Sequence, residues 1–378
     1  MVALEYLPSV MSCQLGLDYL TTGLVAESRP SLSHLDWLLE SASERGDDYL
    51  RARCLTCAAT LLSNLEKFDH PFCRQSSGTP SRYSNSILPS FLSSLCSLLE
   101  SSVETEKLNA LSSLSLFATS SPSAFLNTLS HPNLFPTWIY LLRSQPSLQA
   151  PTLHSIAQVL LYPYALNPNQ PSQPNSKVPP PIHQHPPVRK DQLANSFLSL
   201  LTLHGQDTEE SIVSTLASFY PLKKALFDQI GSFAGKSSSV DYLVKLAKQP
   251  IRETKIGAID VLRSLAYQDH TWGLQTLMGN VGFYNYIQVN QIFCSLCSYP
   301  LPLSSPDNFL FLPHQDRTTE YSIEGKDWKF SLIWAIYASP NTNMLSNDII
   351  QLLQHLLSQG PYYMPPQLED PVTEEKGA

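Results

Sequence analysis

Two stretches of the chain, residues 107–129 (KLNALSSLSLFATSSPSAFLNTL) and residues 255–277 (KIGAIDVLRSLAYQDHTWGLQTL), align with each other without a gap. In both stretches apolar residues recur at the spacing of a helix, a polar turn follows, and a second apolar face begins. The matched apolar pairs are Leu108 and Ile256, Ala110 and Ala258, Leu111 and Ile259, Leu114 and Leu262, Phe117 and Leu265, Ala118 and Ala266, Leu126 and Leu274, and Leu129 and Leu277. The alignment predicts a repeated unit made of a helix, a turn and the start of a second helix.

Two weaker copies of the first helix of this unit occur at residues 49–68 (YLRARCLTCAATLLSNLEKF) and 325–340 (GKDWKFSLIWAIYASP). Helix pairs that bury one face on the preceding pair and another on the next are the units of HEAT and armadillo arrays, at roughly 40–47 residues each. The sequence therefore predicts an all-α protein, a HEAT/armadillo-like α-solenoid of stacked helix pairs.

Helical periodicity also dominates outside the repeat. Apolar stripes at helical spacing are formed by Leu35, Leu38 and Leu39, and by Phe91, Leu92, Leu95, Leu98 and Leu99. In residues 207–221 (DTEESIVSTLASFYP), Asp207 stands three positions before Glu210, as in a capping box. This helix is predicted to end at Pro221, because proline disrupts a helix interior. The 14 glycines include no Asn-Gly hairpin turn, so the sequence gives little support to a β fold.

A proline-rich stretch divides the chain. Residues 162–190 (YPYALNPNQPSQPNSKVPPPIHQHPPVRK) contain too many prolines for a helix or an interior strand, and we interpret them as an insertion or linker. Its P-x-x-P steps offer an alternative role as ligands for an aromatic-groove module. The predicted organisation is N-terminal helical repeats over 1–161, the insertion, C-terminal helical repeats with an end cap over 191–366, and an acidic disordered tail over 367–378.

Composition excludes several classes of function. The 24 basic and 32 acidic residues give a net charge of −8, which argues against a nucleic-acid-binding face. No apolar run approaches the ~18 residues of a membrane span. No Lys or Arg precedes Arg29, so a signal peptide would lack its basic region. Seven cysteines, an odd number in 378 residues, suit reduced thiols. We therefore expect a soluble protein of the cytoplasm or the nucleus that contacts neither nucleic acid nor membrane.

The spacing Cys54-x-x-Cys57 followed by His70-x-x-Cys73 resembles a zinc site. The residues between the two pairs continue a predicted helix, which would separate His70 from Cys57 by about 20 Å. Cysteines on an apolar helix face more often act as small buried side chains. We therefore predict no metal site here.

Other catalytic or cofactor motifs are incomplete. The pair Cys294 and Cys297 has no second ligand pair nearby, and core thiols are the simpler interpretation. Gly231 and Gly235 enclose three residues where a phosphate loop needs four, so a turn between helices is expected. The chain contains no G-x-S-x-G elbow, no H-E-x-x-H and no evident acid/base pair. We expect no enzymatic activity and no cofactor.

Three blocks within residues 251–366 carry a resemblance to a known family: IRETKIGAIDVLRSLAYQDHTWGLQTLMGNVGFYNYI, GKDWKFSLIWAIYAS and LLSQGPYYMPP, in this order. The residues on which it rests are Trp272 after a polar turn, Gly282 and Phe283 before a tyrosine-rich stretch, Lys326, Asp327, Lys329, Phe330 and Ala335, and Gly360 to Tyr363. Together the blocks resemble the last repeats of the 26S proteasome non-ATPase regulatory subunit 5 family, whose members are HEAT/armadillo-like assembly chaperones.

The resemblance implies a non-enzymatic chaperone in assembly of the proteasome regulatory-particle base. Such a chaperone binds the C-terminal domain of one proteasomal ATPase subunit, holds an intermediate that also contains a non-ATPase subunit, and leaves before the particle is complete. The partner-contact candidates are Trp272, Lys326, Asp327, Lys329, Tyr362 and Tyr363. The alternative function is an armadillo-type adaptor or scaffold for transport or signalling.

Each contact candidate also has a purely structural interpretation. Trp272 can pack beneath a turn, and the charged residues at 326–329 can form a solvated helix start. Gly360 can end the last helix as a left-handed cap, after which Tyr362 and Tyr363 fold back over an apolar face that has no further repeat.

Overall fold

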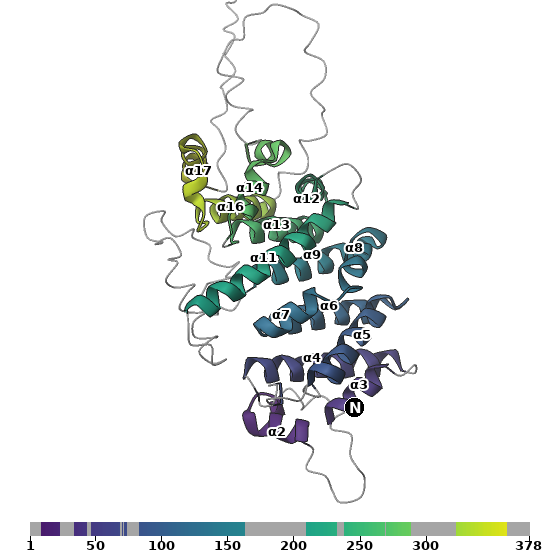
Figure 1. The fold of residues 1–378 in the computed structure, drawn as a ribbon. Helices are drawn as coiled ribbons and strands as arrows, with labels where there is room; N and C mark the ends of the chain where they lie inside the picture. The colour runs from purple at the N-terminus through teal and green to yellow at the C-terminus, as the bar shows by residue number, and fades with distance from the viewer. Residues whose placement is uncertain are drawn as a thin grey trace, which may run out of the picture.

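The computed structural model shows a chain whose regular elements are helices throughout the part that it describes (Figure 1). The described residues are 9–22, 34–43, 47–68, 70, 72–73, 83–162, 209–232, 238–268, 270–288 and 323–360. Within these ranges no strand occurs, which confirms the predicted all-α class.

Five helices pack in sequence order, each against the next, and we call them the row helices (Figure 1). They are α4 (Asp48–Lys67), α6 (Glu104–Ala118), α9 (Pro146–Leu161), α13 (Arg252–Ala266) and α16 (Ile323–Tyr337). A stack in which each unit touches mainly its neighbours is the defining feature of a solenoid. The HEAT/armadillo-like α-solenoid is therefore confirmed, and the two weaker sequence copies, at 49–68 and 325–340, coincide with the first and last of these row helices.

The other helices accompany the row and complete its units. They are α2 (Gln14–Thr22), α3 (His34–Ser43), η1 (Tyr83–Ile87), α5 (Leu88–Leu99), α7 (Pro122–Leu129), α8 (Leu134–Ser144), α11 (Glu209–Ser232), α12 (Ser239–Ala247), α14 (Trp272–Met278), η5 (Thr342–Met344) and α17 (Asn347–Gln359). The row helices α4, α9 and α13 are each preceded by two such helices, so these units hold three helices, as armadillo repeats do, where the sequence predicted pairs. The aligned stretch at 107–129 joins the row helix of one unit to the first short helix of the next.

The alignment of the two repeats holds in three dimensions. The helices α6 and α13 have the same length, 15 residues, and each is followed by a short helix packed against it. The matched pairs from Ala110/Ala258 through Ala118/Ala266 are all buried, as are Leu129 and Leu277. At the outer end of the match, Leu108 is exposed and Ile256 half-buried. The predicted faces of α3 and α5 are also buried, because all eight of their named leucine and phenylalanine side chains lie in the core.

The prediction that a helix ends at Pro221 is wrong, because α11 continues through this proline to Ser232. A proline inside a helix costs about 3 kcal/mol. On its two sides, however, Phe219, Leu226 and Phe227 bury their side chains, and each burial contributes about 1.5–3 kcal/mol. Packing therefore outweighs the local cost. The capping box falls on Asp207, outside the described residues, and on Glu210, of which only the helical course is described.

A buried carboxylate connects three elements of the N-terminal half, α4, η1 and α7. Glu66, near the end of α4, accepts hydrogen bonds from the hydroxyl of Tyr83 in η1 and from Ser121 Oγ at 2.8 Å. Ser121 is the N-cap of α7 and also accepts from the backbone N–H of Ala124. All of these side chains lie in the core, so the interactions fix how α4, η1 and α7 pack against one another.

A second buried network connects α9, α11 and α13. Lys223 Nζ donates to the Tyr162 carbonyl at the C-terminal end of α9 and to Gln268 Oε1 at 3.2 Å. Gln268 Nε2 in turn donates to the carbonyls of Leu160 (2.9 Å) and Ser264 (2.6 Å). A cation at the end of α9 also complements the negative end of the helix dipole. The two halves of the array are therefore joined directly at this point.

The predicted division of the chain can be compared with the structure at one boundary, between the N-terminal repeats and the insertion. The helix α9 ends at Leu161, which matches the boundary of the N-terminal repeats. Tyr162, placed in the insertion by the sequence, is instead buried and stacks on Phe125 with ring centroids 5.0 Å apart. Residues 163–190 and 367–378 lie outside the described residues, so the insertion and the acidic tail remain predictions.

Candidate protein-binding surface

A charged and aromatic cluster crosses the row helices α9, α13 and α16, and we call it the Arg263 surface. Its members are His154 of α9, Asp260 and Arg263 of α13, Tyr267 at the C-cap of α13, and Trp328 of α16. The three residues of α13 follow one another at helical spacing, so they share one face of the helix. All five side chains are exposed or half-buried.

Arg263 is the centre of this surface. Its Nη1 donates to Asp260 Oδ1 at 3.3 Å, and its guanidinium carbon lies 5.8 Å from the centroid of the Trp328 ring. A cation at this distance from an indole face is attracted by the ring quadrupole. The side chains of Arg263 and Asp260 remain 29% and 17% exposed, so a partner protein can still reach them.

The electrostatics are those of a partly desolvated charge pair. Burial raises the pKa of the Asp260 carboxyl, while the nearby positive charge of Arg263 and the imidazole of His154 act in the opposite direction. Burial also raises the pKa of the Tyr267 phenol. A guanidinium carries five N–H donors, and the bond to Asp260 uses one of them. Arginine and tryptophan are the residue types that most often dominate binding at protein interfaces, so the cluster is suited to anchoring a partner protein.

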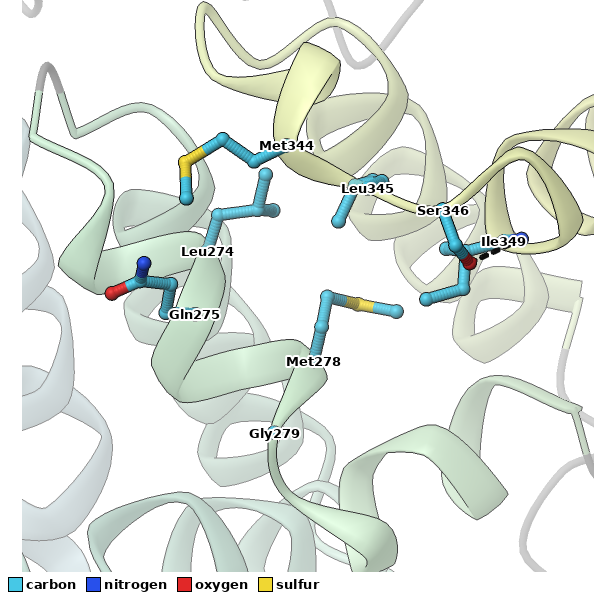
Figure 2. A pocket seen from close by; sticks show the side chains of 8 residues that line it. All are labelled: Leu274, Gln275, Met278, Gly279, Met344, Leu345, Ser346 and Ile349. Carbon is cyan, nitrogen blue, oxygen red and sulfur yellow. Dashed lines mark hydrogen bonds between the residues drawn. The ribbon is translucent and has the colours of Figure 1, made fainter.

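A pocket of about 270 Å³ lies next to the last two elements of the described chain (Figure 2). It is lined by Leu274, Gln275, Met278 and Gly279 of α14 and its C-cap, by Met344 and Leu345 at the end of η5, and by Ser346 and Ile349 at the start of α17. Most of these side chains are apolar, and Figure 2 shows the two methionines on opposite walls. The pocket can therefore make apolar contacts, and its lining residues do not indicate a catalytic role.

Three of the six sequence-predicted contact residues have described side chains, and two of these three are buried. Trp272 is 4% exposed and its ring packs 5.9 Å from that of Phe227, in the position expected for packing beneath a turn. Lys329 is also buried, with Nζ 4.9 Å from the Tyr286 ring centroid. Both residues would have to leave the core to contact a partner. Asp327 is exposed at the start of α16.

The remaining candidates cannot be placed. The helical course of α16 includes Lys326, whose side chain is not described, and Tyr362 and Tyr363 lie outside the described residues. Sequence reasoning missed Arg263 and Trp328. The spacing of Asp260 and Arg263, three residues apart on a helix, was a usable signal for half of the cluster.

The cysteine and histidine spacing does not form a metal site. Cys54 and Cys57 are buried within α4, where burial raises the pKa of both thiols. His70 Nε2 instead lies 2.7 Å from Asp18 Oδ1, and its Nδ1 accepts from the backbone N–H of Phe72. Among the residues that the structure describes, no group of three or more His, Cys, Asp or Glu is arranged to hold a metal ion.

Two further predictions concern loops and membranes. Gly231 lies within α11, whereas Gly235 and the pair Cys294 and Cys297 fall outside the described residues. In the described part of the chain, every helix is too short or too polar to cross a membrane.

Comparisons with known proteins do not assign this chain to a family. No protein-family model and no curated protein matches the chain. Among solved structures, a designed armadillo repeat protein is similar with a TM-score of 0.30 and 13% sequence identity, over 79% of this chain and 98% of the designed chain. The fold assignment rests on the packing of the row helices described above.

Proposed function

We propose that this chain is a non-enzymatic scaffold that acts as an assembly chaperone for the base of the 26S proteasome regulatory particle. In this role it binds the C-terminal domain of a proteasomal ATPase subunit and is released before the particle is complete. The intermediate also contains a non-ATPase subunit, and the work takes place in the cytoplasm or the nucleus. The general part of this proposal, a helical-repeat scaffold, follows from the solenoid.

One observation carries the specific part. The three sequence blocks that resemble the proteasome family lie on α13, α14, α16 and α17, and these helices pack together: α14 and α16 each contact α13, and α17 contacts α16. Residues that are far apart in the sequence therefore form one end of the array. A binding surface that resembles the family's would have to be continuous in this way.

The Arg263 surface lies on two of these helices and is the best-supported contact. A solenoid binds through contacts distributed over a long surface, so a small helical domain can be held without a deep pocket. Asp327 is exposed, lies in the same helix as Trp328 and keeps its place among the contact candidates. Lys326, Tyr362 and Tyr363 also remain candidates, whereas Trp272 and Lys329 act in this proposal by supporting the fold.

A pull-down from native cell lysate tests the proposal, with the chain as bait and mass spectrometry as the readout. We expect regulatory-particle ATPases and a neighbouring non-ATPase subunit, without core-particle subunits. Intact proteasome would contradict a chaperone that leaves early. Recovery of no proteasomal protein would overturn the assignment to proteasome assembly.

Two matched variants locate the contact. Arg263→Ala removes the cation of the Arg263 surface, and an anchor residue of this kind typically contributes about 2 kcal/mol, or roughly thirty-fold in affinity. Tyr140→Ala removes a 63% exposed aromatic side chain on α8, outside the resembling blocks, and serves as the control. We expect the first variant to lose ATPase recovery and the second to retain it.

An armadillo-type adaptor for transport or signalling is the second candidate. The observation that favours it is the guanidinium beside the Trp328 ring, since aromatic and charged side chains on neighbouring repeats suit an extended peptide. In this case the pull-down would recover cargo proteins that share a linear segment. A synthetic peptide of that segment would then bind the chain and fail to bind Arg263→Ala.

A further inference from the structure

The first unit of the array carries a strip of exposed aromatic and apolar side chains, which we call the Trp37 strip. It consists of Leu15 and Tyr19 of α2 and of His34 and Trp37 of α3. Leu15 is 79% exposed, Trp37 47% and Tyr19 44%. The two residues on each helix are three or four positions apart, so they share one helix face. The rings of Tyr19 and His34 lie 5.3 Å apart, and the strip therefore continues from α2 to α3.

The strip is separate from the core of the first unit. The core-facing sides of α2 and α3 are formed by buried leucines, namely Leu17, Leu20, Leu35, Leu38 and Leu39. Apolar residues that are exposed singly are common, whereas a group that spans two helices marks an interaction surface. Because α2 and α3 lie at the opposite end of the array from α16 and α17, this surface is distinct from the Arg263 surface (Figure 1).

The charge of these two helices is negative. In the described ranges 9–22 and 34–43 the acidic residues are Asp18, Asp36 and Glu40, and these ranges contain no Lys or Arg. The Asp18 side chain is 51% exposed, and Glu40 is also exposed. Complementary potentials guide association, so a negative surface attracts a positively charged partner. The charge indicates that the partner of the strip is a basic protein segment.

The next basic residues along the described chain are Arg51 and Arg53 of α4. Both are half-buried, and Arg51 Nη1 lies 3.3 Å from Oε1 of buried Glu106. The charge of Arg51 is therefore compensated within the array and does not balance the carboxylates of α2 and α3.

We propose that the Trp37 strip binds an arginine-rich segment of a partner protein. Glu40 follows Trp37 by three positions on α3, so a carboxylate lies on the same side of the helix as the exposed indole. A guanidinium can stack on an aromatic ring and donate two parallel hydrogen bonds to a carboxylate, whereas an ammonium lacks this planar geometry. Apolar side chains of the same segment cover Leu15 and Tyr19. This contact goes beyond the proposed function and does not depend on it.

Binding of two synthetic peptides to the full chain tests the proposal. One is a short amphipathic peptide of arginine, leucine and alanine, and the other carries lysine at every arginine position. Fluorescence anisotropy of the labelled peptides gives the affinities. We expect the arginine peptide to bind at least about two-fold more tightly than the lysine peptide, because only the guanidinium both stacks and pairs.

Two substitutions remove the features on which the proposal rests. Trp37→Leu keeps an apolar side chain and removes the indole, which should weaken binding of the arginine peptide about two- to five-fold. Glu40→Gln removes a charge without changing the size of the side chain, and the double variant should bind about ten-fold more weakly. If Trp37→Leu loosened α3, as faster amide exchange there would show, Glu40→Gln alone would still test the strip.

The matched control is the double variant Tyr140→Leu and Glu104→Gln. It makes the same change of aromatic ring and of charge at exposed positions on α8 and α6, and it should bind the arginine peptide like the unaltered chain. A general attraction of basic peptides to the acidic chain would weaken equally in both double variants, and this result would overturn the proposal.

Two other results would also overturn it. Equal affinity for the arginine and lysine peptides would exclude recognition of a guanidinium. Self-association of the chain in sedimentation that Trp37→Leu abolishes would identify a second copy of the chain as the partner that covers the strip.

Discussion

The buried hydroxyl of Tyr83 provides the sharpest test of how the units are held together. Tyr83 is 3% exposed and donates to the carboxylate of Glu66, which is 4% exposed and accepts a second bond from Ser121. Tyr83→Phe keeps the ring and removes the donor, so one carboxylate oxygen stays buried with one bond fewer. Hydrogen bonds to charged groups contribute about 1.5–3 kcal/mol, and we expect the variant to lose stability in this range.

A long repeat array need not unfold in one step, so the assay must report on individual helices. Hydrogen exchange followed by mass spectrometry does so, and the expected loss corresponds to about ten- to hundred-fold weaker protection of α4 and α7. Protection of α13 should stay within about two-fold. The control Tyr140→Phe removes the hydroxyl of a 63% exposed tyrosine and should change stability by less than about 0.5 kcal/mol. Equal protection of α4 in the two variants would refute the reasoning.

Three further predictions concern glycine and cysteine positions. Gly257→Ala would place a Cβ 2.9 Å from the Leu153 Cβ, where α13 meets α9. Overpacking of this kind costs about 1–3 kcal/mol of stability, which outweighs the roughly 1 kcal/mol that alanine gains in helix propensity. Urea unfolding should show a less stable protein, and a more stable one would contradict this packing. Gly360→Ala should lower the stability of the last turn of α17 by at least about 1 kcal/mol, because alanine is strained at the positive φ of this residue. The loss should be measurable as faster amide exchange in that turn, and unchanged exchange would contradict the assigned angle. Burial raises the pKa of the Cys96 thiol to about 11. Iodoacetamide at pH 9 should therefore modify exposed Cys13 well before Cys96, because the thiolate is the reactive form. Similar rates at the two thiols would contradict the burial of Cys96.

Much of the fold could be predicted because its units repeat a local pattern. The helices α6 and α13 bury the same matched positions, and the spacing of apolar residues that they share is evident from the amino-acid sequence alone. The third helix of the units was not predicted, since a short element such as α2, with 9 residues, leaves little periodicity to detect. The prediction at Pro221 was wrong because the local cost of a proline is visible in the sequence, whereas the compensating core also depends on α7, α8 and α12, which pack against α11.

The candidate site was harder to predict because its residues come from different units. Asp260 and Arg263 are neighbours on one helix, so their pairing follows from spacing alone. The contact of Arg263 with Trp328 depends on α16 packing against α13, and the sequence does not state which units are adjacent. Trp272 and Lys329 were chosen as exposed contacts, yet both are buried. Burial in a solenoid is set by the neighbouring unit, and a single helix pattern does not contain that information.

The Arg263 surface and the pocket lined by Met278 and Met344 can be tested separately, although both lie toward the C-terminal end of the described array. They share no residue. The Arg263 surface lies on α9, α13 and α16, whereas the pocket is lined by α14, η5 and the start of α17. Two sites are coupled only when a structural element between them has two conformations and each site shifts the equilibrium between these conformations. When two sites share no contacting residues, the free-energy effects of mutating them usually add. We therefore expect Arg263→Ala to leave the methyl NMR signals of Met278 and Met344 unchanged. If the variant shifted these signals, α16, which contacts both α13 and α17, would be the element to examine for a second arrangement.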